Sequence, residues 1–279
     1  MSDETTGPAA TLWFHARGAG DPFVLLHPGG ADSRALEPLV RELPDRYRVL
    51  TPDQRAHGHT ADPGGPLSYA VMAEDTIAFL EQQTRPPVHL LGYSDGAVIA
   101  LTVAMMRPDL IRDLVLVAGV HHRDGWESGV LEGAAQVPEV MADAYAEVSP
   151  HGREHYAQVV AELDRMHAAE PVFTAADLAR LDIPVLVLLG DDDEVRLEHA
   201  VAMYRALPRG ELAVVPHASH GVLVEKPGLC ARLITDFHAP DTPETLAPLR
   251  RRPGHPAGIR PPGAPADRPA ADPAHGEVR

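Results

Sequence analysis

Short apolar runs alternate along this chain with longer stretches in which apolar residues recur at helical spacing. Runs of this kind, bounded by turn residues, are typical of buried strands, and they occupy residues 23–26, 47–51, 88–91, 111–117, 183–189 and 212–215. Helical spacing occupies residues 33–43, 68–83, 97–106, 198–207 and 225–237. Because strands and helices alternate, we expect an α/β fold with a mostly parallel central sheet flanked by helices.

The beginning of this pattern predicts a different local arrangement. Residues 11–17 can form a further strand, and the turn residues of Gly18 to Pro22 separate it from the run at 23–26. Two short strands joined by a glycine-containing turn are typical of a hairpin. We therefore expect a hairpin to open the fold.

The alternation is interrupted between residues 121 and 180. This region has no strong strand, and its helical stretches at 134–148 and 155–169 are separated by prolines. We expect a helical cap insertion at 121–180 over a core formed by 11–120 and 181–238. Such an insertion would select the substrate. Its aromatic and paired histidine side chains can either line a pocket or pack on the core: His121, His122, Trp126, Tyr145 and Tyr156.

Composition narrows the partners and the compartment. The chain has 279 residues, is 44% hydrophobic and carries a net charge of −16, which argues against nucleic acid and anionic membranes as partners. No basic region with a following apolar run marks its start, and no apolar segment approaches the roughly 20 residues of a membrane span. We expect a cytoplasmic protein.

Residues 239–279 are rich in proline and lack periodicity, which predicts a disordered tail. Cys230 is the only cysteine, so the chain forms no internal disulfide.

The pentapeptide Gly92-Tyr93-Ser94-Asp95-Gly96 lies between a predicted strand and a predicted helix. A G-x-S-x-G sequence at such a junction forms a sharp turn that exposes the serine, and the glycines give room for the adjoining elements. The first amides of the following helix have no partners within the helix and point toward the same place. Ser94 is therefore a candidate nucleophile, although the same residues can also form an ordinary turn.

Polar residues follow several of the predicted strands. They are the loop from His27 to Gly30, Ser94, the acidic residues Asp191 to Asp193, and His220. Because the carboxyl ends of parallel strands meet at one edge of a sheet, ligands bind there and we expect these groups to lie together.

The predicted strand ends offer no motif for a metal or a cofactor. The loop at 53–59 contains His57 and His59, but no carboxylate or cysteine stands at a recognised ligand spacing from them. A Gly-x-Gly-x-x-Gly sequence is absent from the strand ends. We therefore expect neither a metal nor a cofactor, and a small molecule as the substrate.

The order serine, acid, histidine along the chain is the order found in α/β-hydrolases. With the elbow, the His27 loop, the acidic turn and the terminal His-Gly, the sequence resembles the α/β-hydrolase superfamily over about residues 11–238. That resemblance implies that Ser94 is the nucleophile and that His220 accepts its proton. His220 matches the family position better than His217 because Gly221 follows it.

The same resemblance implies which carboxylate orients the histidine and which amides form the oxyanion hole. Asp193 lies three residues after Gly190 and matches the usual Gly-x-x-Asp position, whereas Asp191 and Asp192 are expected to cap or solvate the turn. The backbone N–H groups of Gly29 and Asp95 match the oxyanion-hole positions.

The sequence departs from the family pattern at three positions. Pro28 stands where glycine commonly follows the histidine, and Ala56 interrupts the usual Arg-Gly-His run. The Ser94-Asp95 pair is similar to small-ester hydrolases of the valacyclovir hydrolase-like subgroup, but Tyr93 replaces their tryptophan.

The resemblance implies a serine hydrolase of small carboxylic esters that acts through an acyl-enzyme. A serine at position 94 argues against the epoxide hydrolase and haloalkane dehalogenase branches, which use aspartate. Lactonase, thioesterase and carbon–carbon bond hydrolase activities remain alternatives on the same triad, as does a non-catalytic protein of this fold that binds a small ligand.

Overall fold

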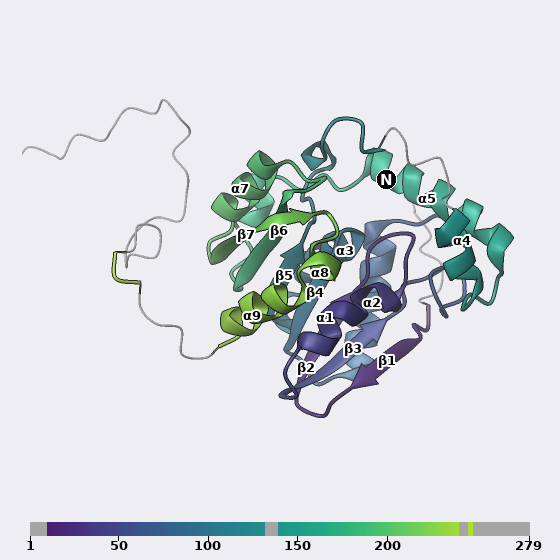
Figure 1. Ribbon diagram of the computed structural model, residues 1–279, viewed down its shortest axis with the longest axis horizontal. Coiled ribbons are helices and arrows are strands. Elements are labelled where there is room, and N and C mark those ends of the chain that lie inside the picture. Colours follow the sequence, from purple (N-terminus) through teal and green to yellow (C-terminus); the bar gives the residue numbers. More distant parts are fainter. Residues whose placement is uncertain (1–9, 132–138, 240–244, 248–279) are drawn as a thin grey trace, which may run out of the picture.

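A computed structural model describes residues 10–131, 139–239 and 245–247 of the chain. Apart from residue 239 and residues 245–247, the tail expected at 239–279 lies outside the described residues. In the part that is described, the alternating pattern folds into a sheet with helices on both faces (Figure 1).

The described strands form a seven-stranded sheet in the order β1-β3-β2-β4-β5-β6-β7. Every neighbouring pair is parallel except β1 and β3, so the sheet is mostly parallel, as predicted. The strands are β1 (Phe14–Arg17), β2 (Asp21–Leu26), β3 (Tyr47–Pro52), β4 (Val88–Tyr93), β5 (Ile111–Val117), β6 (Val185–Asp192) and β7 (Gly210–Ser219).

The predicted opening hairpin is wrong. β1 pairs with β3 and not with β2, because β2 already has β3 on one side and β4 on the other. The turn between β1 and β2 lies against the start of β3, where the N–H of Asp21 donates to the Arg46 carbonyl at 2.9 Å. β1 therefore lies beyond β3, at the outer edge of the sheet.

Helices cover the two faces of the sheet in separate layers. One buried cluster contains side chains of α1 (Glu37–Glu42), α8 (Val222–Glu225) and α9 (Pro227–Phe237). The other contains side chains of α2 (Tyr69–Gln83), α3 (Asp95–Met106) and α7 (Leu197–Ala206). Alternate residues of β2, β3, β4, β5 and β6 point into the two clusters, so these strands are buried on both sides, and their largely apolar runs follow from this.

The ends of these elements show how the sequence positions them. Ser68 caps α2, since its Oγ accepts a hydrogen bond from the Val71 amide at 3.2 Å. Asp32 caps the segment expected as a single helix at 33–43, which divides into a 3₁₀ turn, Ser33–Leu36, followed by α1. The run at 212–215 continues as β7 through Ser219, where Asp192 of β6 still pairs with it.

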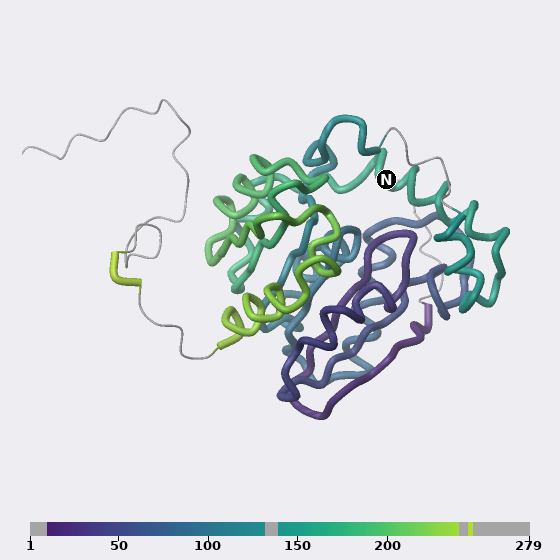
Figure 2. Tube along the Cα trace, viewed as in Figure 1, coloured from purple at the N-terminus to yellow at the C-terminus, as the bar shows by residue number. Residues whose placement is uncertain are grey.

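The described residues between β5 and β6 include three α-helices, namely α4 (Glu139–Ala146), α5 (Tyr156–Ala169) and α6 (Ala175–Leu178). Figure 2 shows the chain leaving the sheet after β5, running through α4 and α5, and returning at β6. Part of the helix expected at 134–148 falls on residues 132–138, outside the described residues. We propose that residues 121–180 form a cap and that the flanking segments form the core.

Cys230 is fully buried on α9, where burial raises the pKa of its thiol to about 11, as suits an inert core residue. Within the part of the chain that the structure describes, no helix combines the length and the apolar character needed to cross a bilayer.

Candidate active site

Ser94 lies on a strained turn between β4 and α3. Its φ of 56° is in the left-handed region, which costs free energy for any residue with a Cβ. A Cβ at Gly92 would lie 2.0 Å from the Gly96 carbonyl oxygen, and one at Gly96 would lie 2.4 Å from that of Leu26. Both glycines are therefore required by close backbone approach, and the turn holds the serine away from the strand.

His220 lies within hydrogen-bond distance of both other residues of the expected triad. Ser94 Oγ lies 3.0 Å from His220 Nε2, and His220 Nδ1 lies 2.9 Å from Asp193 Oδ1. The contacts join the end of β4, the turn after β6 and the turn after β7. With a proton on Nδ1, the imidazole donates to the carboxylate and leaves Nε2 free to accept from the hydroxyl.

Asp193 is held more firmly than its two acidic neighbours. Its side chain is 1% exposed, and its oxygens accept hydrogen bonds from the amides of Val195 at 3.0 Å and Gly190 at 3.2 Å. Asp191 and Asp192 are less buried, and Asp191 accepts from the Ala218 amide. Both are the last residues of β6, and their expected role in capping or solvating the turn stays a prediction.

His220 is fixed at both its ring and its backbone. Burial alone would lower its pKa, but the hydrogen bond and charge of Asp193, with Glu194 nearby, outweigh burial and raise the pKa of His220 above its usual value. The Tyr93 hydroxyl donates to the His220 carbonyl at 2.6 Å. The tyrosine that replaces the expected tryptophan thus supports the histidine.

Gly29 and Asp95 lie side by side at the edge of the sheet. The Asp95 amide is the first of α3, and a Cβ added at Gly29 would lie 1.9 Å from Asp95 Oδ2. The next amide along the loop, that of Gly30, donates to His57 Nε2 at 3.2 Å. Burial lowers the pKa of His57 to about 4, so the ring stays neutral and can accept this bond at neutral pH.

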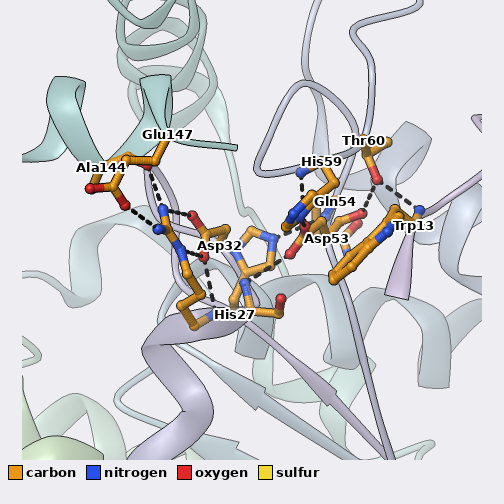
Figure 3. A network of polar contacts seen from close by, with 11 residues as sticks. Trp13, His27, Asp32, Asp53, Gln54, His59, Thr60, Ala144 and Glu147 are labelled. Carbon is orange, nitrogen blue, oxygen red and sulfur yellow. Dashed lines mark hydrogen bonds and ion pairs between the residues drawn. The ribbon is translucent and has the colours of Figure 1, made fainter. Parts of the chain in front are cut away.

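A network of polar contacts supports the His27 loop from behind (Figure 3). His27 Nε2 accepts from the Gln54 amide at 2.9 Å, while Nδ1 donates to the Pro28 carbonyl at 2.8 Å. Fully buried Asp53 accepts from the amide and from Nδ1 of His59, each at 2.9 Å. The two histidines weighed as metal ligands, His57 and His59, therefore serve as hydrogen-bonding partners of the loops.

Ala56, which stands where the family usually has glycine, has a strained backbone conformation. Its φ is 62°, a conformation that glycine adopts freely and alanine does not. The usual glycine of this run thus has a conformational reason, and this chain accepts strain at that position. Tyr145, from the proposed cap, donates to the Ala56 carbonyl at 3.2 Å.

A pocket of about 240 Å³ opens directly in front of Ser94. The proposed cap covers it with α5 and with Trp126, whose ring lies 5.8 Å from that of His220 in an edge contact. Of the aromatic residues considered from the sequence, Trp126 and Tyr156 line this pocket, while Tyr145 is buried beside it. The lining also includes Gly29, Gly30, Asp95, Val130, Leu131, Val160, Leu163, Asp164, His167, Glu194 and His220.

The Asp95 side chain points toward the proposed cap and meets a histidine there. His167 Nε2 lies 2.8 Å from Asp95 Oδ1 and 3.0 Å from Oδ2, and the Tyr69 hydroxyl donates to Oδ1 at 2.6 Å. Burial alone would raise the pKa of Asp95, but His167 and Tyr69 hold it below its usual value. Burial would lower the pKa of His167, and Asp95 raises it above its usual value. Each shift favours the charged form of its group, and the contact is an ion pair when His167 is protonated.

His167, Asp164 and Glu194 are pocket residues that the sequence interpretation missed. A signal was present for the first two, because Val160, Leu163, Asp164 and His167 follow the spacing i, i+3, i+4 and i+7 and so share one face of α5. Two polar residues on an otherwise apolar helical face indicate a surface that is not simply packed against the core.

A separate polar cluster lies at the amino-terminal edge of the sheet. His89, Asp113 and His238 place their ligand atoms within 4.8 Å of one another, a donor set of the type that a divalent metal accepts. Asp113 accepts from His89 Nδ1 at 2.8 Å, and His238 Nε2 lies 3.1 Å from the carboxylate. The Tyr47 hydroxyl lies within hydrogen-bond distance of His238 Nδ1, at 2.9 Å. These contacts fasten the end of α9 to β3, β4 and β5.

Several curated relatives match most of the chain. A 2-(acetamidomethylene)succinate hydrolase of Mesorhizobium japonicum is 25% identical over 253 residues, covering 81% of this chain and 91% of the relative. A pimeloyl-(acyl-carrier protein) methyl ester esterase of Aliivibrio salmonicida is 24% identical over 255 residues, covering 82% of this chain and 95% of the relative.

Solved structures share the fold at lower identity. A serine hydrolase involved in carbazole degradation superposes with a TM-score of 0.69 at 20% identity, covering 81% of this chain and 93% of that one. The enol-lactonase from Burkholderia xenovorans gives a TM-score of 0.66 at 19% identity, covering 82% and 98%. The model of the alpha/beta hydrolase family matches residues 23–233. The chain therefore belongs to the alpha/beta hydrolase family.

Proposed function

We propose that this protein is a serine hydrolase of small-molecule carboxylic esters. The observation that carries the proposal is the continuous line of contacts from Ser94 Oγ to His220 Nε2, at 3.0 Å, and from His220 Nδ1 to Asp193, at 2.9 Å. A pocket open to this hydroxyl gives a small substrate access to it. A carbonyl carbon bound there would face the Ser94 hydroxyl, whose proton His220 can accept while Asp193 orients the imidazole.

The proposed reaction has two halves. The Ser94 oxygen attacks the ester carbonyl carbon while His220 Nε2 takes the hydroxyl proton, and the carbonyl oxygen becomes an oxyanion that the Gly29 and Asp95 amides stabilise. When the intermediate collapses, the alcohol leaves with the proton from His220 and the acyl group stays on Ser94. Water then gives its proton to His220 and attacks the acyl carbon. The acid leaves, and the proton returns to Ser94.

A second candidate is hydrolysis of a small amide-bearing substrate on the same residues. The relative from Mesorhizobium japonicum, whose name specifies an acetamidomethylene substrate, supports it. The chemistry would differ only in the leaving group, which must be protonated by His220 as it departs. Lactones, thioesters and activated carbon–carbon bonds belong in the same substrate screen, because selection among them depends on pocket shape.

Fluorophosphonate labelling tests the nucleophile before any substrate is identified. We expect one equivalent of label on the peptide that contains Ser94, because among the described residues this is the only serine hydroxyl that contacts a histidine oriented by a carboxylate. Mass mapping separates this peptide from those of Ser33 and Ser219. Well-folded protein that takes no label, or takes it at another serine, would contradict the proposal.

The rate of ester hydrolysis should decline at low pH, and the midpoint of this acid limb should lie above pH 6.5, the usual pKa of histidine. His220 must be neutral to accept the Ser94 proton, and its pKa is raised above its usual value. As the pH falls through that pKa, the imidazole becomes protonated and kcat/KM should decline about tenfold per pH unit. Rates on a neutral p-nitrophenyl ester between pH 5 and 9 measure this. A limb centred below pH 6 would show that another group controls the rate.

A further inference from the structure

The Asp95 carboxylate lies where a negative charge should hinder the proposed reaction. It is 3% exposed, and its Oδ2 lies against the backbone of Gly29, whose amide is a proposed oxyanion donor. An oxyanion forming between the amides of Gly29 and Asp95 would therefore develop close to a buried carboxylate. Like charges repel strongly in such a poorly solvated site.

His167 supplies the opposite charge from the proposed cap. It lies on α5, its side chain is 18% exposed, and its Nε2 contacts both oxygens of Asp95 at 2.8 and 3.0 Å. Tyr69 donates to the same carboxylate at 2.6 Å but is neutral. An imidazolium at position 167 thus neutralises the carboxylate, whereas a neutral ring would leave it charged beside the oxyanion loop.

We propose that His167 is a positioning residue that neutralises and orients Asp95, so that the cap helix α5 makes the site compatible with oxyanion formation. The inference rests on the serine hydrolase function proposed above. It adds a residue that belongs to neither the triad nor the oxyanion hole. It also makes catalysis depend on the docking of α5 over Ser94.

The charge on His167 is set by its surroundings. Burial disfavours the imidazolium, but contact with Asp95 outweighs burial and the pKa of His167 is raised, with Asp164 acting in the same direction. Tyr69 stays protonated, since burial and the Asp95 charge raise its pKa well above the usual value. The titratable groups around the pair are Tyr69 of α2, Asp164 and Glu170 from α5 and its end, His57 after β3, and His220 after β7.

A double-mutant cycle tests the inference on a neutral p-nitrophenyl ester. We expect His167→Gln to lower kcat at least tenfold, with a smaller change in KM, because it leaves Asp95 as an uncompensated charge. In an Asp95→Asn background the same substitution should cost less than twofold, since no charge then needs neutralising. An equal loss in both backgrounds would mean that His167 acts only by packing, and would overturn the inference.

The pH dependence provides a second readout. The ratio of wild-type kcat/KM to that of His167→Gln should fall as the pH rises through the pKa of His167, and the contribution of His220 cancels in this ratio. His167→Lys keeps a cation, so it should retain more activity than His167→Gln. The ratio of kcat/KM for His167→Lys to that for His167→Gln should not fall up to pH 9. A constant ratio of wild type to His167→Gln, or a lysine variant as poor as glutamine, would contradict a role for charge.

His155→Gln is the matched control. His155 is also a cap histidine paired with a core aspartate, its Nε2 lying 3.1 Å from Asp62 Oδ2, but neither residue lines the Ser94 pocket. The ratio of wild-type kcat/KM to that of His155→Gln should therefore stay constant as the pH changes. If this variant reproduces the His167→Gln phenotype, cap docking alone explains both, which would overturn the inference. Ser94-dependent turnover of the wild type is measured first, because its absence would overturn the proposed function and this inference with it.

Discussion

Ser94→Ala should abolish turnover while leaving the fold intact. The substitution removes the attacking oxygen, and loss of the nucleophile from such a triad costs roughly 10⁴- to 10⁶-fold in kcat. The Ser94 hydroxyl bonds His220 and no buried group depends on it for a partner among the described residues, so the free energy of unfolding should change by less than about 1 kcal/mol. Ester hydrolysis at saturating substrate and chemical denaturation measure the two quantities.

Ser94→Gly sharpens this test because it separates activity from strain. The glycine variant is equally unable to attack, but it adopts the φ of 56° without the penalty that alanine and serine incur. It should therefore be inactive and also more stable than Ser94→Ala, by up to about 1 kcal/mol. Turnover within tenfold of the wild type in either variant would rule out Ser94 as the nucleophile.

Asp193→Asn should be the second most damaging change. Asparagine keeps the shape of the side chain, but its amide can donate to His220 Nδ1 and so move the imidazole proton to Nε2, where it blocks acceptance from Ser94. We expect kcat to fall roughly 10²- to 10⁴-fold. The acid limb of the pH profile should also move to lower pH, since the aspartate raises the pKa of His220.

Asp192→Asn is the matched control for this prediction. Asp192 is adjacent, has the same chemistry and lies exposed at the end of β6, whereas the hydrogen bond to His220 Nδ1 comes from Asp193. It should keep activity within about twofold of the wild type, as surface substitutions usually do. If Asp192→Asn proves the worse variant, the orienting carboxylate has been assigned to the wrong residue.

Much of this architecture follows from local patterns in the sequence. The run Ile111 to Val117 matches β5 to the residue, because a strand buried on both faces is largely apolar. Ser68 marks the beginning of α2 for a similar reason, since a serine before a helix can satisfy a free amide. The family order of serine, acid and histidine then indicated the three residues that the structure brings into contact.

What the sequence did not predict depends on contacts between distant residues. The pairing of β1 with β3 is decided by the two neighbours that already flank β2, which no local pattern records. The bond between His167 and Asp95 joins residues 72 positions apart in different layers. In each case the local signal was present, a strand or a polar residue on a helical face, but its partner could be found only in three dimensions.

The long connection between Ser94 and His220 has a consequence for the order of folding. The two residues are 126 positions apart, whereas β2, β3, β4 and β5 all lie before residue 118. The centre of the sheet can therefore assemble while the base is still part of an unfolded segment, and parallel pairing over long separations is slow. A chain emerging during synthesis could form the turn that carries Ser94, the proposed nucleophile, before His220 has been placed beside it. The proposed activity would then arise only after β6 and β7, which precede Asp193 and His220, have joined the sheet.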